Sequence, residues 1–589
     1  MMRICDRFYR KTILSGAACA TLLLIAGFIN SNAQQGGTIT GRVMNDEGAG
    51  APNVTVHIIR ATSGRSGASP RGDTQVVTDK DGNFRATGLS PGLYAVDVFR
   101  AKEYVMRPLT AAESRERRYY RVGDSITITL VKGGVITGRV TDSDGQPMVG
   151  LQVSATMVRD AEGYSVRAAP QGEPRMTDDR GIYRIFGLRP GSYIVGASGK
   201  MYLASFSPYA GSAITYHPSS TLDTAAEVAV ASGAEASGVD IQFRGGPGYV
   251  VSGTVTTTSA TLASRPTVVS LTNTDINSVT GFASVRHNDP KKGFMIKGVN
   301  NGNYEIVAYS SGDQELDASS APRRVTISGA DVTGLELRIS PLASVSGQVF
   351  IEASSKSCGN KSKRAMEEIM IYARSDDPAA LDARASSVPH FFRSDAVVNE
   401  KGEFAIHPLR PSRYHFEASL PDENWYTRSI TIPAPAAARE PQALMNLRDI
   451  SRAGLEIKPG DKVTRVTVKI AEGAAGLRGK VVAENEGASL PLRLRVHLAP
   501  VDAALANEVL RYAEVLTRND GSFAFNNLAP GKYWLLARPV PDDEPVDRPP
   551  RLLSWDSDER ARLRMEAEKK KIEVELKPCQ RLNDFSFKF

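Results

Sequence analysis

The side chains that most often do chemistry in proteins are few in this sequence and widely scattered. None of its seven histidines begins a His-x-x-Glu pair, the spacing that places two ligands on one zinc ion. We find no coherent catalytic constellation and therefore expect no enzyme, no catalytic residue, no metal and no cofactor. The histidines are His57, His217, His287, His390, His407, His415 and His497.

Short acidic turns are the second place where chemistry could occur. Asp79 stands near Asp81, and Asp142 stands near Asp144. Carboxylate oxygens bind calcium, but a calcium site takes six to eight oxygens and each turn supplies only two carboxylates. The spacing therefore favours a turn-forming role for these acids.

Aromatic side chains gather in one insertion, residues 201–239. Ring faces match the apolar faces of pyranose sugars, so this insertion could bind a glycan by stacking. The alternative, which we favour, is that the rings cover the end of their own domain. The candidate glycan-stacking residues are Tyr202, Phe206, Tyr209 and Tyr216.

Four cysteines are present, and Cys5 and Cys19 lie in the N-terminal 33 residues. An exported chain that loses this segment keeps Cys358 and Cys579, and two thiols in an oxidising compartment tend to pair. We predict a disulfide between them. The chain-entropy estimate is about 5 kcal/mol, an upper bound because separately folding domains do not share one unfolded ensemble. The alternative is two isolated thiols.

A motif that occurs five times supplies the elements that carry these residues. Each copy opens with a strand around Gly-x-Val and continues, roughly 40 to 55 residues later, with a turn glycine, an alternating strand, a second turn and a strand that begins with Tyr. The period of about a hundred residues suits a small domain with its own core. We expect the Tyr ring to pack on that core and its hydroxyl to bond the backbone near the turn. The copies open at Gly41, Gly138, Gly253, Gly347 and Gly479.

The motif resembles the carboxypeptidase regulatory-like domain. The first copy reads TDKDGNFRATGLSPGLYAV from Thr78 to Val96, and the third is degenerate, with Lys292 in place of the turn glycine. The resemblance implies a transthyretin-like (prealbumin-like) sandwich, often grouped with starch-binding-like folds, that is an accessory beside a catalytic domain in the carboxypeptidases. We thus predict an all-β chain of five tandem Greek-key β-sandwiches and one polar helix near the C-terminus.

The repeat starts define the expected domains. Short linkers between them favour a stiff rod or a curved arc. The helix is expected over Asp556 to Lys571, with Asp556 as its cap, against one sheet edge. The expected boundaries are 1–33 (signal peptide), 34–133, 134–245 (aromatic insertion), 246–341, 342–472 (long loop insertion) and 473–589 (polar helix).

The N-terminus has the layout of a secretory signal. Four basic residues precede an apolar stretch from Ile13 to Ile29, and Ser31-Asn32-Ala33 suits cleavage before Gln34. A retained anchor is the alternative. The formal charge of +7 falls to about +4 without this segment, which holds four bases and one acid. Such a dilute charge does not indicate nucleic-acid binding.

We expect an exported protein of the periplasm, the outer-membrane surface or the exterior that acts as a non-enzymatic binding or spacer protein. Two alternatives remain: a carbohydrate-binding protein, and an accessory component of a peptidase or outer-membrane receptor system. The partners would be carbohydrate or envelope proteins. The ending Leu582, Phe585, Phe587, Phe589 is similar to the last strand of an outer-membrane barrel. Without further lipid-facing strands we expect no transmembrane barrel, and a final strand of the fifth sandwich explains the alternation equally well.

Overall fold

The computed structural model describes most of the chain from Gly36 onward. The expected signal peptide lies outside the described residues. The described ranges are 36–61, 74–98, 104–107, 119–163, 166, 170–199, 209, 211–276, 278–285, 293–311, 316–352, 358–359, 365–376, 395–433, 447–484, 490–491, 493–518, 520–541 and 552–589.

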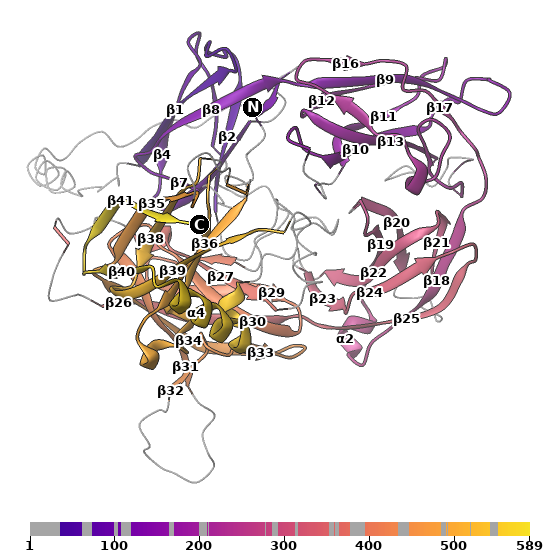
Figure 1. Cartoon of the computed structure of the whole chain (residues 1–589). Helices are drawn as coiled ribbons and strands as arrows, with labels where there is room; N and C mark the ends of the chain where they lie inside the picture. The colour runs from indigo at the N-terminus through magenta and orange to yellow at the C-terminus, as the bar shows by residue number, and fades with distance from the viewer. Residues whose placement is uncertain are drawn as a thin grey trace, which may run out of the picture.

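The protein is all-β and consists of five sandwiches in tandem (Figure 1). Five hydrophobic cores fall within residues 39–130, 136–243, 251–339, 343–470 and 475–587. Each core is built from one copy of the repeat, and we call the corresponding units domains 1 to 5.

Domains 1 and 2 each pair two sheets. Domain 1 contains β1 (Gly37–Asn45), β2 (Thr55–Arg60), β3 (Thr74–Val77), β4 (Asn83–Leu89), β5 (Leu93–Val98), β6 (Tyr104–Met106), β7 (Tyr120–Arg121) and β8 (Ser125–Lys132), in the orders β4-β1-β8-β6 and β3-β2-β5-β7. Domain 2 contains β9 (Gly134–Thr141), β10 (Gln152–Arg159), β11 (Pro170–Met176), β12 (Ile182–Leu188), β13 (Gly191–Ser198), β14 (Thr215–Tyr216), η2 (Leu222–Thr224), β15 (Val228–Val230), β16 (Glu235–Ala236) and β17 (Ile241–Gln242), with sheets β12-β9-β16 and β11-β10-β13-β14.

Domain 3 differs because β23 joins its two sheets into one. It contains β18 (Tyr249–Thr256), α2 (Ala260–Ala263), β19 (Thr267–Asn273), β20 (Ser278–Val285), β21 (Gly293–Val299), β22 (Gly302–Ser311), β23 (Leu316–Ser320), β24 (Arg323–Ile327) and β25 (Val332–Pro341). The order is β20-β19-β22-β23-β25-β18-β21, with β24 on β22. The one-turn helix α2 was not predicted from the sequence.

Domains 4 and 5 return to two sheets. Domain 4 contains β26 (Ala343–Glu352), η3 (Met366–Glu368), β27 (Met370–Ser375), β28 (Asp395–Val397), β29 (Glu403–Leu409), β30 (Ser412–Ser419), β31 (Trp425–Pro433), β32 (Leu447–Asp449), β33 (Leu455–Ile457) and β34 (Lys462–Glu472), with orders β29-β26-β34-β31-β32 and β28-β27-β30-β33. Domain 5 contains β35 (Ala475–Val482), β36 (Leu494–Pro500), η4 (Ala503–Leu505), η5 (Val509–Arg511), β37 (Ala513–Leu516), β38 (Ser522–Leu528), β39 (Gly531–Pro539), η6 (Leu553–Trp555), α4 (Ser557–Lys570), β40 (Glu573–Leu576) and β41 (Arg581–Lys588), with orders β38-β35-β41 and β37-β36-β39-β40.

The opening glycine of each repeat is explained by a parallel strand pair. The opening strand of every domain pairs with its closing strand in parallel, so the chain starts and ends each sandwich in the same sheet. A Cβ on the glycine would come within about 3 Å of a backbone carbonyl oxygen of the closing strand, so no larger residue fits. The facing pairs are Gly41 with Ile126, Gly138 with Val239, Gly253 with Leu335, Gly347 with Val466 and Gly479 with Phe585.

The repeated tyrosine forms the same hydrogen bond in all five domains, as predicted. Its ring is buried in the core, and its hydroxyl donates to the carbonyl oxygen four residues earlier, at the preceding turn. This bond fixes the turn against the core because both partners come from one short segment. The pairs are Tyr94 with Ser90 (2.6 Å), Tyr193 with Arg189 (2.6 Å), Tyr304 with Asn300 (2.9 Å), Tyr414 with Arg410 (3.0 Å) and Tyr533 with Ala529 (2.6 Å).

The C-terminal helix begins where the sequence predicts. Asp556 accepts the backbone N–H groups of Asp558 and Glu559, and lysines occupy the last turn. Its position was predicted incorrectly, because the helix lies on a sheet face rather than an edge. Leu563 and Ala567 pack on Trp534 and Leu536 of β39 and on Ala499 of β36. The terminal phenylalanines belong to β41, the closing strand of domain 5.

The five domains follow a curve that brings the first domain back against the fourth, so the expected rod is wrong and the expected arc is closed. Figure 1 shows domain 1 beside the orange and yellow domains at the other end of the chain. Met370 of domain 4 packs with Ala61 and Leu93 of domain 1, and Arg121 pairs with Glu368 at 3.5 Å. The short linkers are confirmed, since β8 and β9 are separated by one residue and β34 and β35 by two. Short linkers restrict swing but allow sharp turns between consecutive domains.

Candidate functional site

The aromatic insertion of domain 2 does not present the stacking surface that one interpretation of the sequence required. Tyr216 is only 7% exposed, and burial raises the pKa of its phenol. Tyr209 packs edge-on against Phe243, with 5.9 Å between ring centroids. Tyr202 and Phe206 lie outside the described residues. Tyr216 is therefore not available to stack on a sugar. Tyr209 covers part of its own domain, as the alternative interpretation of the insertion expects.

The insertion instead joins domain 2 to domain 3. Ile214 donates its backbone N–H to the side chain of Asn300 at 2.9 Å, and Asn300 returns a bond to the carbonyl of Ile214 at 2.8 Å. Tyr216 follows two residues later and lies near Tyr304, which raises its pKa further. The physical role of these residues is docking between neighbouring sandwiches.

The acidic turns use their carboxylates on their own backbone. One oxygen of Asp79 accepts the N–H groups of Asp81 (3.0 Å) and Asn83 (2.8 Å), and Asp142 does the same for Asp144 and Gln146. These bonds hold the pKa of Asp79 below its ordinary value. The turn-forming role is confirmed for both. Among the described residues, no group of three or more His, Cys, Asp or Glu side chains could hold a metal ion.

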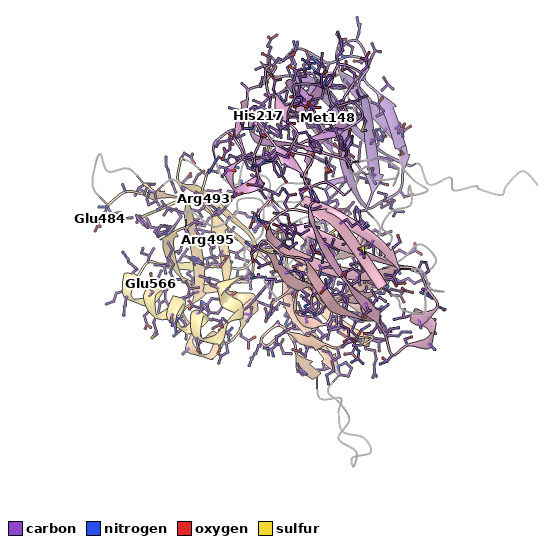
Figure 2. The ribbon with its side chains drawn as sticks, turned by 90° about the vertical axis from the view of Figure 1, so that its right-hand side faces the viewer. Met148, His217, Glu484, Arg493, Arg495 and Glu566 are labelled. Atoms are coloured by element: carbon purple, nitrogen blue, oxygen red, sulfur yellow. A yellow bond between two sulfur atoms is a disulfide. The ribbon has the colours of Figure 1, made fainter. Side chains whose placement is uncertain are left out.

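Two histidine–carboxylate pairs resemble parts of a catalytic site but are buried. His415 lies 3.1 Å from Asp376 and stacks on Trp555 of domain 5, with 4.5 Å between ring centroids. His497 lies 3.5 Å from Glu514, within domain 5. The histidine side chains are 4% and 2% exposed, so no substrate in solution reaches them. Domain 5 also carries Arg493 and Arg495, and its helix α4 carries Glu566 (Figure 2).

A Gly-x-Ser-x-Gly sequence, which sequence reasoning overlooked, occurs at residues 88–92. It has the spacing of a nucleophile elbow, but it forms the turn that carries the chain from β4 in one sheet to β5 in the other, rather than a strand-to-helix turn. The carbonyl of Ser90 accepts the hydroxyl of Tyr94, and the matching turn of domain 2 carries Arg189 in place of the serine. The match is thus a feature of the repeat.

The candidate binding site is a groove of about 720 Å³ on the outer face of the larger sheet of domain 4. This volume falls within the range of small-molecule sites in proteins. The groove crosses all five strands, from β29 through β26, β34 and β31 to β32. Four spacings of about 4.8 Å give it a length of about 19 Å.

The lining combines flat apolar surface with polar groups. Phe350 is 45% exposed and Leu447 is 55% exposed, although both are large hydrophobic side chains. Glu403, Arg465 and Thr467 add an acid, a base and a hydroxyl to the same lining. Glu403 accepts a hydrogen bond from the side chain of Asn399 at 3.0 Å, which fixes the carboxylate next to the turn.

The other repeats show which lining residues the fold requires. Gly347, Phe404 and Val466 are present for the fold, since every domain has a glycine facing the closing strand and a buried aromatic after the turn. Phe350 and Glu403 are specific to domain 4. The residues equivalent to Phe350 are Met44, Thr141, Thr256 and Val482, and all four are half-buried. The residues equivalent to Glu403 are Asn83, Ile182, Gly293 and Ser522.

Arg465 adopts a backbone conformation that disfavours most L-residues. Its φ is +64°, at the bulge of the closing strand that places Val466 opposite Gly347. The equivalent positions carry Gly238, Gly334 and Asp584, residue types that tolerate this region. An arginine here costs the fold about 1 to 2 kcal/mol relative to glycine, so the fold does not explain its presence.

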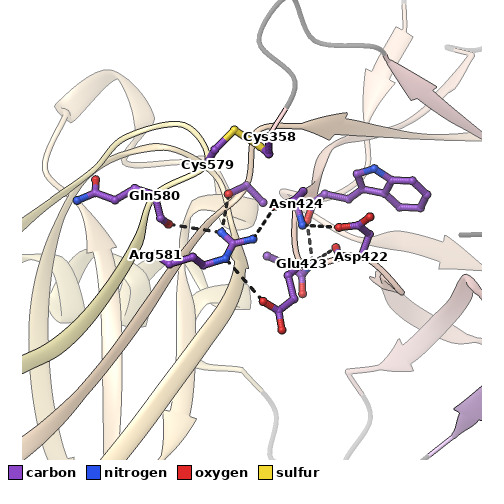
Figure 3. Close-up of polar contacts among 10 residues, drawn as sticks. Cys358, Asp422, Glu423, Asn424, Cys579, Gln580 and Arg581 are labelled. Atoms are coloured by element: carbon purple, nitrogen blue, oxygen red, sulfur yellow. Dashed lines mark hydrogen bonds and ion pairs between the residues drawn. A yellow bond between two sulfur atoms is a disulfide. The ribbon is translucent and has the colours of Figure 1, made fainter. Parts of the chain in front are cut away.

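The junction between domains 4 and 5 contains the predicted disulfide (Figure 3). Cys358 and Cys579 are bonded, with 5.3 Å between their Cα atoms. Beside the bridge, Arg581 donates to the carbonyl of Ala474 at 2.8 Å and to the side chain of Asn424 at 2.9 Å. Across the same junction, Asn527 donates to the carbonyl oxygens of residues 422 and 425.

One family model matches the chain. The family model of the carboxypeptidase regulatory-like domain matches residues 38–116 and 135–243, so the resemblance is confirmed for domains 1 and 2. No curated protein matches the chain.

Three solved bacterial proteins illustrate the structures to which the chain is similar. They are the Bacillus anthracis TIE protein (11% identity, 52% of this chain and 51% of that chain, TM-score 0.14), the minor pilin GBS52 of Streptococcus agalactiae (13%, 35% and 96%, 0.19) and the major pilin subunit BcpA of Bacillus cereus (11%, 52% and 99%, 0.13). The chain thus spans about half the length of the first of these proteins.

Proposed function

We propose that this protein is an exported, non-enzymatic scaffold that holds five β-sandwiches in a fixed arrangement and presents a binding surface on one of them. The observation that carries the proposal is the set of specific contacts at the domain junctions. A chain of independent modules would need none of them.

The junctions support a spacer of defined shape. Domains 2 and 3 are joined by the paired bonds of Ile214 and Asn300, and domains 4 and 5 by a disulfide and the contacts of Arg581. Domain 1 returns to domain 4 through Met370 and the Arg121–Glu368 ion pair. An arrangement fixed at both ends of the chain keeps its surfaces at constant distances from one another.

The disulfide supports export, because disulfides persist in oxidising compartments and are rare in a reducing cytosol. The signal-like layout of the N-terminal 33 residues suggests the same route. In the part of the chain that the structure describes, no helix combines the length and the apolarity needed to cross a bilayer.

A non-enzymatic role is supported by the burial of the two histidine–carboxylate pairs and by the use of the acidic turns for backbone bonding. The repeated motif is accounted for by folding alone, through its glycine and its tyrosine. Phe350, Glu403 and Arg465, which the repeated fold does not require, line the domain 4 groove, and we assign them to a binding surface. The alternative of an accessory component in a peptidase or receptor system is compatible with this scaffold.

Small-angle scattering and cell fractionation test the proposal. A linear rod of five sandwiches, each about 34 Å across, has a radius of gyration of about 50 Å, whereas the closed arrangement has a value much nearer the roughly 24 Å of a single compact body. We expect to find the protein in the exported fraction. On a denaturing gel, the unreduced chain should migrate faster than the reduced chain. A rod-like profile, or a reduced chain confined to the cytosol, contradicts the proposal.

A further inference from the structure

We infer that the groove on domain 4 is a binding site for a neutral oligosaccharide. The inference rests on the proposed function, since it names the ligand class of the scaffold's binding surface. It moves the expected glycan site from the domain 2 insertion, where Tyr216 is buried, to Phe350, Glu403 and Arg465.

The ligand must have a flat apolar face. Phe350 projects from β26, the second of the five strands that the groove crosses, with 45% of its surface exposed, and Leu447 and Pro433 line the far end. A pyranose ring offers a face of C–H groups that stacks on an aromatic ring in this way. The groove is open and crosses the strands, so it admits a chain of rings rather than a single buried ring.

The ligand must also carry neutral polar groups at its edges. Glu403 and Arg465 supply one negative and one positive charge, so the lining has no preference for a charged ligand. A carboxylate and a guanidinium bind hydroxyl groups well, because the first accepts and the second donates several hydrogen bonds. Ser346 and Thr467 add hydroxyls that both donate and accept. This set matches the hydroxyl-rich edge of a saccharide.

An extended peptide fits the groove less well. Peptides bind sheets by adding a strand to an edge, where backbone groups are open. At the floor of this groove β26 already pairs with β29 on one side and β34 on the other, and β34 pairs with β31. The floor therefore offers side chains and no backbone ladder.

Arg465 gives an independent reason to assign a ligand. Its left-handed conformation is suited to glycine, and two of the equivalent bulges do contain glycine. Its guanidinium forms no ion pair with any residue of the described ranges. Retention of a strained arginine at the groove is explained if the guanidinium contacts a bound molecule.

The test is calorimetric titration of the full mature chain with three neutral hexasaccharides, namely an α-1,4-glucan, a β-1,4-glucan and a β-1,4-linked N-acetylglucosamine oligomer. A pooled hexapeptide library serves as the competing ligand class. We expect at least one hexasaccharide to bind and Phe350→Ala to weaken its binding by about 5- to 150-fold, by analogy with aromatic stacking on flat ligands.

Two further variants separate binding from folding. Phe282→Ala removes a phenylalanine with 37% exposure from the surface of domain 3 and is expected to leave affinity unchanged. Arg465→Gly removes the guanidinium but relieves the backbone, so it is expected to weaken binding at least fivefold while the melting temperature stays the same or rises.

Binding of none of the hexasaccharides overturns the assignment, and so does binding of the peptide library alone. An equal loss of affinity in Phe350→Ala and Phe282→Ala places the site elsewhere and also overturns it. None of these outcomes changes the scattering profile or the cell fraction, so a failure here is distinguishable from a failure of the scaffold proposal.

Discussion

The hydroxyl of Tyr533 offers a sharp test of how each sandwich is stabilised. Tyr533 is 1% exposed, and its hydroxyl donates to the carbonyl of Ala529 at 2.6 Å. Tyr533→Phe removes the donor without leaving a large cavity. The carbonyl of a 5% exposed residue then loses this partner, which costs about 1 to 3 kcal/mol.

The assay uses the positions of the three tryptophans. Trp425 lies in domain 4, and Trp534 and Trp555 lie in domain 5, so tryptophan fluorescence reports unfolding of these two domains only. With a urea dependence of about 1 to 3 kcal/mol/M, Tyr533→Phe should lower the fluorescence midpoint by about 0.3 to 3 M. Tyr94→Phe removes the same bond from domain 1 and should leave this midpoint nearly unchanged.

Two results would refute this reasoning. A midpoint for Tyr533→Phe within about 0.2 M of the parent would mean that the hydroxyl contributes nothing to domain 5. An equal shift in both variants would mean that all five domains unfold together, so that the fluorescence signal is not specific to the last two.

Three further predictions concern a turn, an insertion and a junction. The backbone N–H of Ile182 holds the pKa of Asp178 below its ordinary 3.8, so the ionised carboxylate stabilises the fold above that pH, and this contribution disappears as the pH falls through the lowered pKa. Asp178→Asn places at this turn the residue type that domain 4 has at Asn399. The variant should therefore show a weaker dependence of the free energy of unfolding on pH between about pH 5 and 2. Tyr216→Ala should cost about 3 to 5 kcal/mol, seen as a lower melting temperature by calorimetry, and an unchanged melting temperature would argue that the ring is not core. Arg581→Met should cost about 1 to 2 kcal/mol in the fluorescence assay, since the guanidinium is 30% exposed, and Arg478→Met in the same domain serves as a control expected to have a smaller effect.

Much of the fold could be predicted because its determinants repeat. The turn glycines, the alternating strand and the tyrosine lie within about 20 residues in every copy, and each makes its main contacts within that segment or with its own domain. The opening glycine was equally visible in the sequence. The reason for it was not, because the carbonyl that it approaches lies 82 or more residues later in the chain.

The groove residues were not predicted, although the sequence held a signal for them. Phe350 and Glu403 differ in type from the corresponding residues of the other four copies, and a column-by-column comparison of the repeats would have selected both. Arg465 also differs in type from its counterparts Gly238, Gly334 and Asp584, but only the structure shows that all four share a positive φ at a bulge. The aromatic insertion attracted attention because clustered rings are conspicuous, but the burial of Tyr216 occurs where domain 2 meets domain 3.

The sequence by itself determined the number of sandwiches, their all-β character, the helix cap at Asp556 and the pairing of the last two cysteines, because these follow from local periodicity, turn chemistry and counting. The tertiary structure decided the return of domain 1 to domain 4, the helix position on a sheet face, the burial of Tyr216 and the exposure of Phe350. These features depend on contacts between surfaces far apart in the chain, as between Leu93 and Met370. Docking of this kind leaves no periodic pattern, since a few side chains on otherwise ordinary strands are enough to create it.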